Sequence, residues 1–558
     1  MLGKLNRSPR KLPRWLLLLI PLAFMGLFFY TPLVMIFERM LDVIATDGLG
    51  SGNASRTIWR AFRFTVWQAS LSTLLTLLLG LPAAYLFARF RFPGKRLFSV
   101  LFILPFILPT VVVVTAFTAT LGAGGWVNKA LMAIFQLDKA PLNLLNSLWA
   151  ILLVHVFYNV SIIIRVVGAS WSQLDQRTMH AARVLGASPL RTFVEVTLPL
   201  LRPAILAATL LVFLFDFASF GVVLMLGGAG FATLEVEIYI QALHLLNLPL
   251  AAVLSAVQLV STLVLMLLYQ RLQSGESIPL LPRVNNENAQ KPTTLVQKLF
   301  VSGLLLSLLI FLTLPLVTLV LRSVQYTARG DASTVWTLQF YQELFINRRG
   351  SLFYVPPIEA VKNSLIYAGI TMGFSIFLGF QIAYAFEKNT SWSRWLETAV
   401  MLPLGSSPIT LGLGYLLIFS RPPWTDIDFP ILIPIAHTLV ALPMVVRTLQ
   451  PALRSIPRNL RDSAGVLGAS PLQRWLQIDL PILSKAALTA GIFAFTVSLG
   501  EFGATSFLAR PENPTMPTAI YRFFAQPGSM NFGQAMAMSV ILLVICGGSI
   551  FVIELLEK

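Results

Sequence analysis

The hexapeptide LGASPL occurs twice in this chain, at Leu185–Leu190 and again at Leu467–Leu472. In each copy the glycine, Gly186 or Gly468, lies thirteen residues before a proline. The offset between the copies is 282 residues, and the sequence around both is strongly apolar. A polar loop that is repeated in register within an apolar chain predicts a duplicated membrane unit. Such a unit presents two equivalent docking loops on one side of the bilayer.

The composition places the chain among membrane proteins. Hydrophobic residues make up 56% of its 558 residues and charged residues only 12%, against about 25% charged in a typical soluble domain. The net charge of +17 does not indicate nucleic acid as a partner, because the basic residues flank apolar segments and are not gathered in one domain. The single cysteine, Cys546, lies in an apolar run, where we expect it to serve packing.

Apolar windows of 18 or more residues predict an all-α polytopic protein with about twelve membrane-spanning helices. The predicted spans are 15–37, 64–88, 97–121, 147–168, 201–226, 248–270, 297–321, 362–386, 396–419, 430–447, 483–508 and 533–555. Two of these spans contain Pro105, Pro109, Pro403 and Pro408, which we expect a helical bundle to tolerate.

Basic residues predict the orientation. Lys4, Arg7, Arg10, Lys11 and Arg14 precede the first span with no acidic residue among them, so the N-terminus is expected in the cytoplasm. A cleaved signal peptide is the alternative, but the apolar run is too long and no small-residue cleavage site follows it. Twelve spans then place the C-terminus and both LGASPL loops in the cytoplasm as well.

The chain divides into two parallel halves of six spans. Residues 272–296 are rich in Gly, Pro and Asn and predict a cytoplasmic linker between a first repeat at 1–271 and a second at 297–558. An even number of spans per half makes the repeats parallel. Near the second span of each half the offset rises to 299 residues, from Ala84-Tyr85 to Ala383-Tyr384, which predicts an external insertion around 323–361.

The sequence of each repeated loop predicts a helix break followed by a new helix. We expect Gly186 to end a helix that begins after Gln173, and Ser188 to cap the next one with Pro189 in its first turn. Pro199 is expected to end this second, short amphipathic helix at the entrance to the next span. Its apolar face is formed by Leu190, Phe193 and Val194. That face can pack under its own protein or into a groove of a partner.

The loops resemble the EAA loop of type I ABC importer permeases. Ala181-Ala182, three residues and Gly186, followed thirteen residues later by Pro199, match the pattern in the first half. The family's glutamate is replaced here by His180. The resemblance implies a coupling loop at about 173–199.

The second copy, at about 455–481, departs slightly further from the pattern. Ala464 and Gly468 keep their places and Pro481 closes the copy, but Asp462 replaces the glutamate and Ser463 replaces one of the two alanines. These changes put in question the salt bridge that the family's glutamate makes, and they leave the loop geometry unaffected.

The resemblance implies a division of labour between subunits. In this family the loop docks into a cytoplasmic ATPase subunit, of which two copies are expected, and an extracytoplasmic binding protein delivers the substrate. The chain has no G-x-x-x-x-G-K-[ST] motif, and its nearest fragment, Pro93–Arg96, lacks the first glycine and the hydroxyl residue. ATP and Mg²⁺ are therefore expected on the partner, with no cofactor or metal in this chain. The expected location is the inner membrane of a prokaryote.

Ionisable residues inside predicted spans are candidates for the translocation pathway, because charge at membrane depth is costly. Asp216 lies in the fifth span and Glu501 in the eleventh, and Ser219 is the repeat mate of Glu501. His155 recurs as His437. The alternative is that the acids pair locally and brace the bundle, and that the histidines hold contacts between helices.

Two acids in a pathway favour a cationic or metal-bearing substrate. The fused halves and the segment His155–Asn159 resemble thiamine permeases, as does Phe217–Phe220. Fused ferric-iron permeases share the architecture, and Gly500–Thr505 also resembles permeases of the molybdate and sulfate type. We therefore expect thiamine, with ferric iron, or another small cation or oxyanion, as the alternative.

Two other classes of protein fit the sequence less well. A proton-coupled secondary transporter would share twelve spans and parallel halves, but it has no use for the repeated loops. A membrane-embedded enzyme would need a clustered nucleophile or metal set, and the four histidines and one cysteine are scattered.

Overall fold

The computed structural model describes residues 14–46, 52–102, 104–273, 289–327, 334–347, 355–387, 391–420, 422 and 429–556. Basic residues 4–11, on which the predicted orientation depends, lie outside this set, as do residues 274–288 of the predicted linker. The described end of the linker lies against the first half. There the Gln290 backbone N–H donates to the Arg89 carbonyl (2.8 Å), and the Arg91 N–H donates to the Gln290 carbonyl (2.8 Å).

The described chain is almost wholly helical. The first half contains α1 (Leu19–Met25), α2 (Thr31–Thr46), α3 (Gly52–Arg89), α4 (Lys95–Leu101), α5 (Leu104–Ile107), α6 (Thr110–Leu121), α7 (Trp126–Phe135), α8 (Leu148–Gln173), α9 (Gln176–Val184), α10 (Pro189–Thr192), α11 (Leu198–Phe217), α12 (Gly221–Leu226), α13 (Leu234–Tyr239) and α14 (Leu248–Gln273).

The second half has a similar order of helices and adds a small hairpin. It contains α15 (Leu295–Arg322), β1 (Gln325–Thr327), β2 (Thr334–Trp336), α16 (Gln339–Gln342), α17 (Glu359–Ala385), α18 (Ser391–Met401), α19 (Pro408–Phe419), α20 (Phe429–Arg454), α21 (Arg458–Val466), α22 (Pro471–Arg474), α23 (Leu480–Gly500), α24 (Gly503–Leu508), α25 (Met516–Ala525) and α26 (Ser529–Leu556). The strands pair antiparallel, with Tyr326 opposite Val335.

The number of spans agrees with the sequence. The described residues contain 11 helices long and apolar enough to cross a membrane. The total is 12 if the bent pair Leu396–Gly405 and Pro408–Phe419, which turns by 97°, is taken as one span. In the first half, α6 and α7 together give one such stretch, although the chain turns at 122–125 between them.

Four of the predicted spans are broken, contrary to the sequence prediction. The span predicted at 201–226 ends as a helix at Phe217 and resumes as the short α12, and the span at 483–508 breaks in the same way after Gly500. The spans predicted at 97–121 and 396–419 are interrupted before α6 and α19, at Pro109 and Ser407. The physical reason for the breaks before α6 and α19 is that Pro109 and Pro408 have no N–H for the helical ladder, and here the chain uses proline as a break and not only as a kink.

The two halves exchange their first helices. In the first half α2 packs against its own α14 and also against α19 of the second half. In the second half α15 packs against its own α26 and against α6 of the first half. The hydroxyls of Thr120 on α6 and Thr318 on α15 form a buried contact between the halves. Each half is therefore held to the other by a helix that crosses over.

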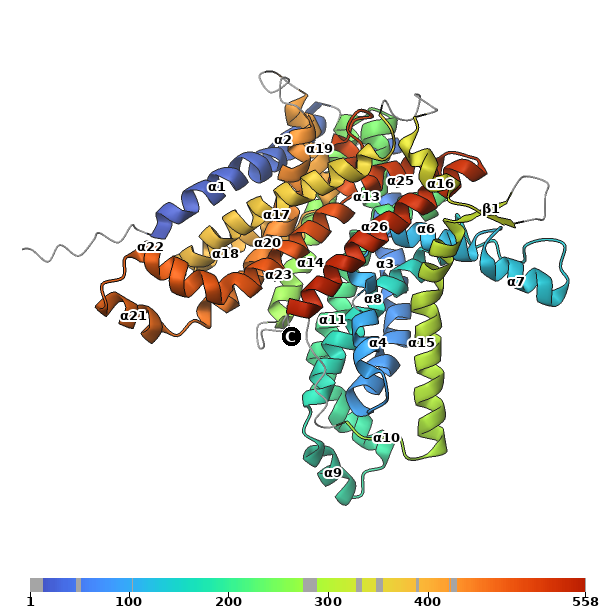
Figure 1. Cartoon of the computed structure of the whole chain (residues 1–558), viewed down its shortest axis with the longest axis horizontal. Coiled ribbons are helices and arrows are strands. Elements are labelled where there is room, and N and C mark those ends of the chain that lie inside the picture. Colours follow the sequence, from blue (N-terminus) through green and yellow to red (C-terminus); the bar gives the residue numbers. More distant parts are fainter. Residues whose placement is uncertain are drawn as a thin grey trace, which may run out of the picture.

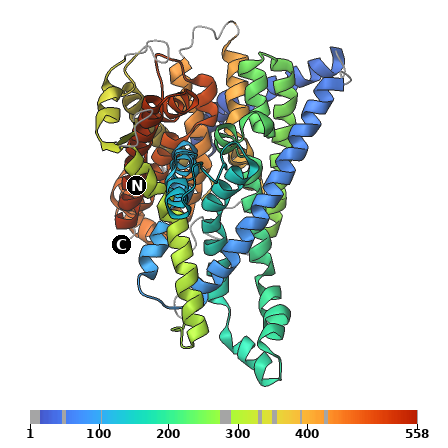
Figure 2. The same cartoon turned by 90° about the vertical axis from the view of Figure 1, so that its right-hand side faces the viewer.

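The bundles diverge from a shared region. In Figure 1 the first-half helices α3, α8 and α11 run toward the bottom of the view, and the second-half helices α17, α20 and α23 run toward the left. Figure 2 shows from the side that α9 is the far end of the first bundle. The loops that carry α9 and α21 are thus at the separated ends of two arms, while α12 and α24 lie where the arms meet.

Unmatched segments explain the change of offset. The predicted insertion at 323–361 is where the structure has β1, β2 and α16. The first half has its own extra element, α7, which the sequence did not predict and which has no counterpart between α19 and α20 among the described residues. Figure 1 shows α7 projecting to the side of the bundle.

Matched glycines permit the same close packing in both halves. A Cβ on Gly80 of α3 would lie 2.7 Å from the side chain of Ile163 on α8. A Cβ on Gly379 of α17 would lie 2.7 Å from Val445 on α20. Small residues at such positions let transmembrane helices approach closely, so these two glycines fix the central helix pair of each half.

Replacing Gly80 or Gly379 with valine is expected to lower the thermal stability of the purified protein. The added side chain overlaps the facing helix, and overpacking of this kind costs roughly 1–3 kcal/mol. Gly369→Val on the same α17 is the matched control, since nothing lies within 4 Å of a Cβ there. The measurement is the melting temperature in detergent, and equal melting temperatures for Gly379→Val and Gly369→Val would contradict the packing.

Candidate functional site: two docking loops and two buried polar clusters

The two LGASPL loops have the same backbone. Both α9 and α21 end at a glycine with positive φ, +91° at Gly186 and +83° at Gly468, a conformation that glycine adopts without strain. Ser188 then caps the next helix, because its hydroxyl accepts from the Arg191 N–H (3.2 Å). Ser470 accepts from the Gln473 N–H at the same distance, 3.2 Å. The predicted break and cap are confirmed in both copies.

The prediction that Pro199 and Pro481 end a short helix is wrong. The helix that begins at Pro189 continues to Phe217, and its mate continues from Leu472 to Gly500. A π-helical turn, Phe193–Thr197, precedes α11, and the Leu198 N–H bonds to the Phe193 carbonyl. This shift of the ladder accommodates the proline that follows. The short crosswise helices of the loops are therefore α9 and α21, which come before the glycines.

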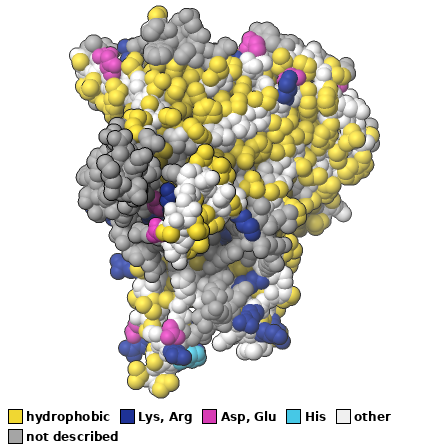
Figure 3. All heavy atoms as spheres, turned by 60° about the vertical axis from the view of Figure 1, so that its left-hand side comes forward, with side chains coloured by type: hydrophobic (Ala, Val, Ile, Leu, Met, Phe, Trp, Pro, Cys, Tyr) yellow, Lys and Arg dark blue, Asp and Glu magenta, His cyan; other side chains and the backbone are white. Residues whose placement is uncertain are grey.

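The tips of both loops are apolar and exposed. Val184 and Leu185 are 87% and 88% exposed, and Val466 and Leu467 are 88% and 87% exposed. Adjacent exposed apolar residues make these tips candidates for an interaction site. Figure 3 shows the pattern in the first half: hydrophobic side chains cover the upper body, Lys and Arg gather toward the lower end where α9 lies, and the lowest tip is hydrophobic.

The sequence repeat includes the residues of these tips, but the predicted apolar face did not include them. The repeat begins one residue earlier than LGASPL, at Val184 and Val466. Of the predicted face, Leu190 is 73% exposed, but Phe193 stacks on Trp171 with ring centroids 6.1 Å apart. Part of that face is thus used within the protein.

The remaining predicted docking residues are distributed over the same loops. His180 and Ala181 on α9 and Asp462 and Ser463 on α21 are exposed, as are Pro199 and Pro481 at the starts of α11 and α23. Ala182 and Ala464 are half-buried. Their contact with a partner stays a prediction.

A buried polar cluster lies at the end of α11. Asp216 and His155 are 1% and 3% exposed, with Asp216 Oδ1 lying 3.5 Å from His155 Nδ1. Asn159 Nδ2 donates to the same carboxylate oxygen (2.6 Å), and Gln68 Nε2 donates to the Asp216 carbonyl (2.7 Å). The other ring nitrogen of His155 is 2.7 Å from Ser219 Oγ. The cluster joins α3, α8 and α11 across the helix break.

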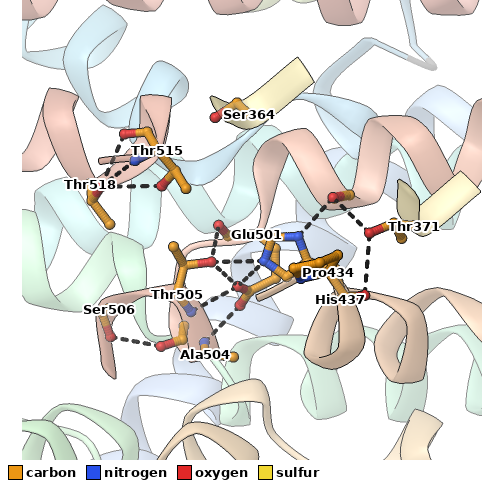
Figure 4. Close-up of polar contacts among 12 residues, drawn as sticks. Ser364, Thr371, Pro434, His437, Glu501, Ala504, Thr505, Ser506, Thr515 and Thr518 are labelled. Carbon is orange, nitrogen blue, oxygen red and sulfur yellow. Dashed lines mark hydrogen bonds and ion pairs between the residues drawn. The ribbon is translucent and has the colours of Figure 1, made fainter. Parts of the chain in front are cut away.

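The second half has a corresponding cluster around Glu501, drawn in Figure 4. His437 Nε2 lies 3.1 Å from Glu501 Oε2, and His437 Nδ1 lies 2.7 Å from Ser498 Oγ. The carboxylate also accepts from the backbone N–H groups of Ala504 (2.8 Å) and Thr505 (3.0 Å) and from the Thr505 hydroxyl (2.6 Å). Glu501 therefore caps the N-terminus of the short helix α24.

Each cluster contains a histidine between an acid and a serine, but the acid and the serine lie at opposite ring nitrogens in the two halves. In the first half Nδ1 of the histidine faces the acid, Asp216, and Nε2 faces Ser219. In the second half Nδ1 faces Ser498, and Nε2 faces the acid, Glu501. Each predicted pathway residue is brought to its own histidine, and the clusters form two separate networks within their own halves. This geometry favours bracing of the helix breaks over direct contact with a substrate.

Aromatic rings close the contact between the halves. Phe220 and Phe502, which immediately precede α12 and α24, stack with centroids 5.4 Å apart and an interplanar angle of 28°. Tyr239 packs against Phe220, and Tyr521 packs against Phe502, both at 5.4 Å. The four rings obey the same pseudo-twofold relation as the loops. We call them the aromatic quartet.

Glycine is required beside the aromatic quartet. A Cβ on Gly221 would lie 2.6 Å from Thr110 Oγ1 and 3.3 Å from the Phe502 ring. A Cβ on Gly503 would lie 3.1 Å from Pro408. The breaks therefore let α12 and α24 press against the first turns of α6 and α19.

Glu501→Gln is expected to lower the thermal stability of the protein with little effect on uptake per folded molecule. The glutamine side chain would place its NH₂ group against the N–H and hydroxyl groups that donate to the Glu501 carboxylate. Leaving a buried donor without an acceptor costs about 1–3 kcal/mol. The measurements are the melting temperature and uptake normalised to folded protein. Ser219→Ala at the equivalent position is the control and should cost less. Normal stability with reduced uptake would instead place Glu501 in the pathway.

Relatives of the chain are transport permeases. The chain is 28% identical to the thiamine transport system permease protein of Brucella abortus, over 91% of this chain and 90% of that protein. It is 27% identical to the protein of the same name from Haemophilus influenzae, over 87% of this chain and 86% of that protein. Identity to the Escherichia coli protein of that name is 26%, over 88% and 87%.

A family model matches the chain twice, at residues 76–276 and 372–558, once in each half. The exchanged helices Leu16–Ala45 and Leu295–Arg322 lie outside both matched ranges. The matched ranges contain both docking loops, the aromatic quartet, and both polar clusters apart from Gln68. The chain is a multi-pass membrane protein, and it belongs to the family of binding-protein-dependent transport system inner membrane components.

Proposed function

We propose that the chain forms the complete translocation pathway of an ATP-driven thiamine importer. The observation that carries this proposal is the pair of loops with matching glycine φ angles and serine caps, each with an exposed Val-Leu pair beside the glycine. Two copies of a cytoplasmic ATPase subunit would bind them, one per loop. ATP hydrolysis and its Mg²⁺ would belong to that subunit.

The mechanism we propose is a rocking of the two halves. The aromatic quartet is in contact and the α9 and α21 ends are apart. In the proposed mechanism this arrangement would be the form open toward the cytoplasm. Closure of the ATPase pair around ATP would draw α9 and α21 together. Because the helices of each half are packed as a body, that movement would separate Phe220 from Phe502 and admit substrate from the binding protein on the other side.

Two considerations support thiamine as the substrate. The relatives named above are thiamine transport permeases, and the similarity covers most of the length of each. The aromatic quartet also suits a small aromatic cation, since ring faces attract positive charge and stack on flat rings. The cytoplasmic placement of both termini remains part of the proposal and follows from the basic residues before the first span.

Transport is tested by reconstituting the chain with its cognate ATPase and binding protein in liposomes. With ATP available to the ATPase, labelled thiamine should accumulate inside, and without the ATPase the chain should neither transport nor hydrolyse ATP. Labelled ferric iron with its own binding protein is offered in parallel. Accumulation of iron without thiamine would contradict the substrate, and accumulation driven by a proton gradient without ATP would contradict the class of transporter.

The docking loops are tested by charge substitution. Leu185→Asp combined with Leu467→Asp is expected to reduce co-purification of the ATPase at least about tenfold, since burying a charge in an apolar groove costs well over the 1.4 kcal/mol that a factor of ten represents. Leu295→Asp is the matched control, because Leu295 is also exposed (73%) but lies outside the loops. Unchanged co-purification in the double variant would exclude these tips from the interface.

A further inference from the structure

The two docking loops are fixed to the membrane helices by different chemistry. On α21 the side chain of Arg461 lies between two carboxylates. Its Nε donates to Asp479 Oδ1 (2.7 Å), and its Nη1 pairs with Glu387. Asp479 directly precedes α23, and Glu387 follows α17. One guanidinium therefore joins the crosswise helix of the loop to two membrane helices.

This ionic clamp is largely shielded from water. The side chains of Arg461, Glu387 and Asp479 are 17%, 19% and 8% exposed. Tyr384 on α17 donates its hydroxyl to Asp479 Oδ2 (2.8 Å), and its ring centroid lies 6.0 Å from the guanidinium. Burial alone would lower the pKa of Arg461, but Asp479 and Glu387 outweigh it and raise that pKa. Such forked, charge-assisted bonds fix orientation as well as distance.

The first half has no charge at the corresponding positions. Met179 stands where the second half has Arg461, Thr197 where it has Asp479, and Ala88 where it has Glu387. Arg89 contacts Met179 there, with Nη2 2.8 Å from the sulfur.

Aromatic stacking holds the first loop instead. Phe193 stacks on Trp171, and Tyr85, the repeat mate of Tyr384, packs on the same Trp171 with centroids 5.2 Å apart. These ring contacts, together with the Arg89–Met179 bond, constrain orientation less than a forked pair of charge-assisted bonds does. Packed elements held in this way can slide past one another by small amounts.

We infer that Arg461 is a positioning residue that locks the second docking loop to α17 and α23, so that the second half moves with its ATPase subunit as one rigid body while the first half is held more loosely. This inference rests on the proposed function, because it concerns how movement of an ATPase reaches the membrane helices. It predicts that the two halves contribute unequally to coupling although their loops share one sequence and one backbone.

The test replaces the second half's clamp with the first half's residues. The variants are Arg461→Met and Asp479→Thr, alone and together, and Met179→Leu is the matched first-half control, a swap of similar volume. Each is reconstituted with the partner ATPase and binding protein, and the readout is substrate imported per ATP hydrolysed. Either single variant should lower this ratio at least about fivefold, the lower end of typical coupling between sites.

The double variant should lower the ratio no further than a single one, because both changes break the same interaction. The import-to-hydrolysis ratio of Met179→Leu should stay within about twofold of the wild-type ratio, as expected for a volume-conserving change. If Arg461→Met and Asp479→Thr leave the ratio unchanged, the inference is wrong. It is equally wrong if they reduce only yield, melting temperature or assembly, since Arg461 then serves stability alone.

The result is separable from the proposed function. Import by the wild-type protein is measured first, with thiamine and with ferric iron, and the ratio is taken with whichever substrate is imported. Absence of any ATP-dependent import by wild type would overturn the proposed function. Normal import by wild type with equal ratios in all variants would overturn only the role of Arg461.

Discussion

A polypeptide that breaks its helices at membrane depth must supply hydrogen-bond partners for the freed backbone, and this constraint shapes the centre of the molecule. The breaks after Phe217 and Gly500 turn α12 and α24 toward each other. Each break is braced by a buried histidine together with an acid and a hydroxyl. Glu501 performs the most direct part of this task, since its carboxylate takes the N–H groups of Ala504 and Thr505. The buried polar groups thus make possible the turn that brings Phe220 to Phe502.

A single backbone plan in this chain accommodates different side-chain chemistry in its two halves. The histidine keeps its place at 155 and 437, while the acid moves from one ring nitrogen to the other. The docking loops keep the sequence LGASPL, while the residues that anchor them change from an aromatic stack to an ionic clamp. Joining the halves in one chain explains this freedom. Because the second half always meets the first, each half needs only to complement the other and not to pair with a copy of itself.

Much of this architecture follows from sequence, and what does not has identifiable causes. The number of spans, the division into halves and the glycine break with its serine cap were predictable from apolar windows, the repeat and helix-capping rules. The helix breaks after Phe217 and Gly500 were not, because the apolar pattern resumes after Asp216 and Glu501 and extends to 226 and 508. Pro199 was misread as a stop, since a π-helical turn that accommodates it leaves no mark in the pattern. The Arg461 clamp was not predicted because it joins residues distant in sequence. A comparison of the halves could have indicated it, since the matching first-half residues are neutral.

We propose that the loops approach each other when the partner subunits bind ATP, while the arms separate at the aromatic quartet. Arg177 and Asn459 are exposed repeat mates on α9 and α21, and they can be replaced by cysteine in a Cys546→Ser background and spin-labelled. The distance between the labels is then measured by electron paramagnetic resonance in the complex with the ATPase. A clear shortening with a non-hydrolysable ATP analogue is the result that the account predicts. The same distance distribution with and without the nucleotide, in a complex that transports, would contradict it.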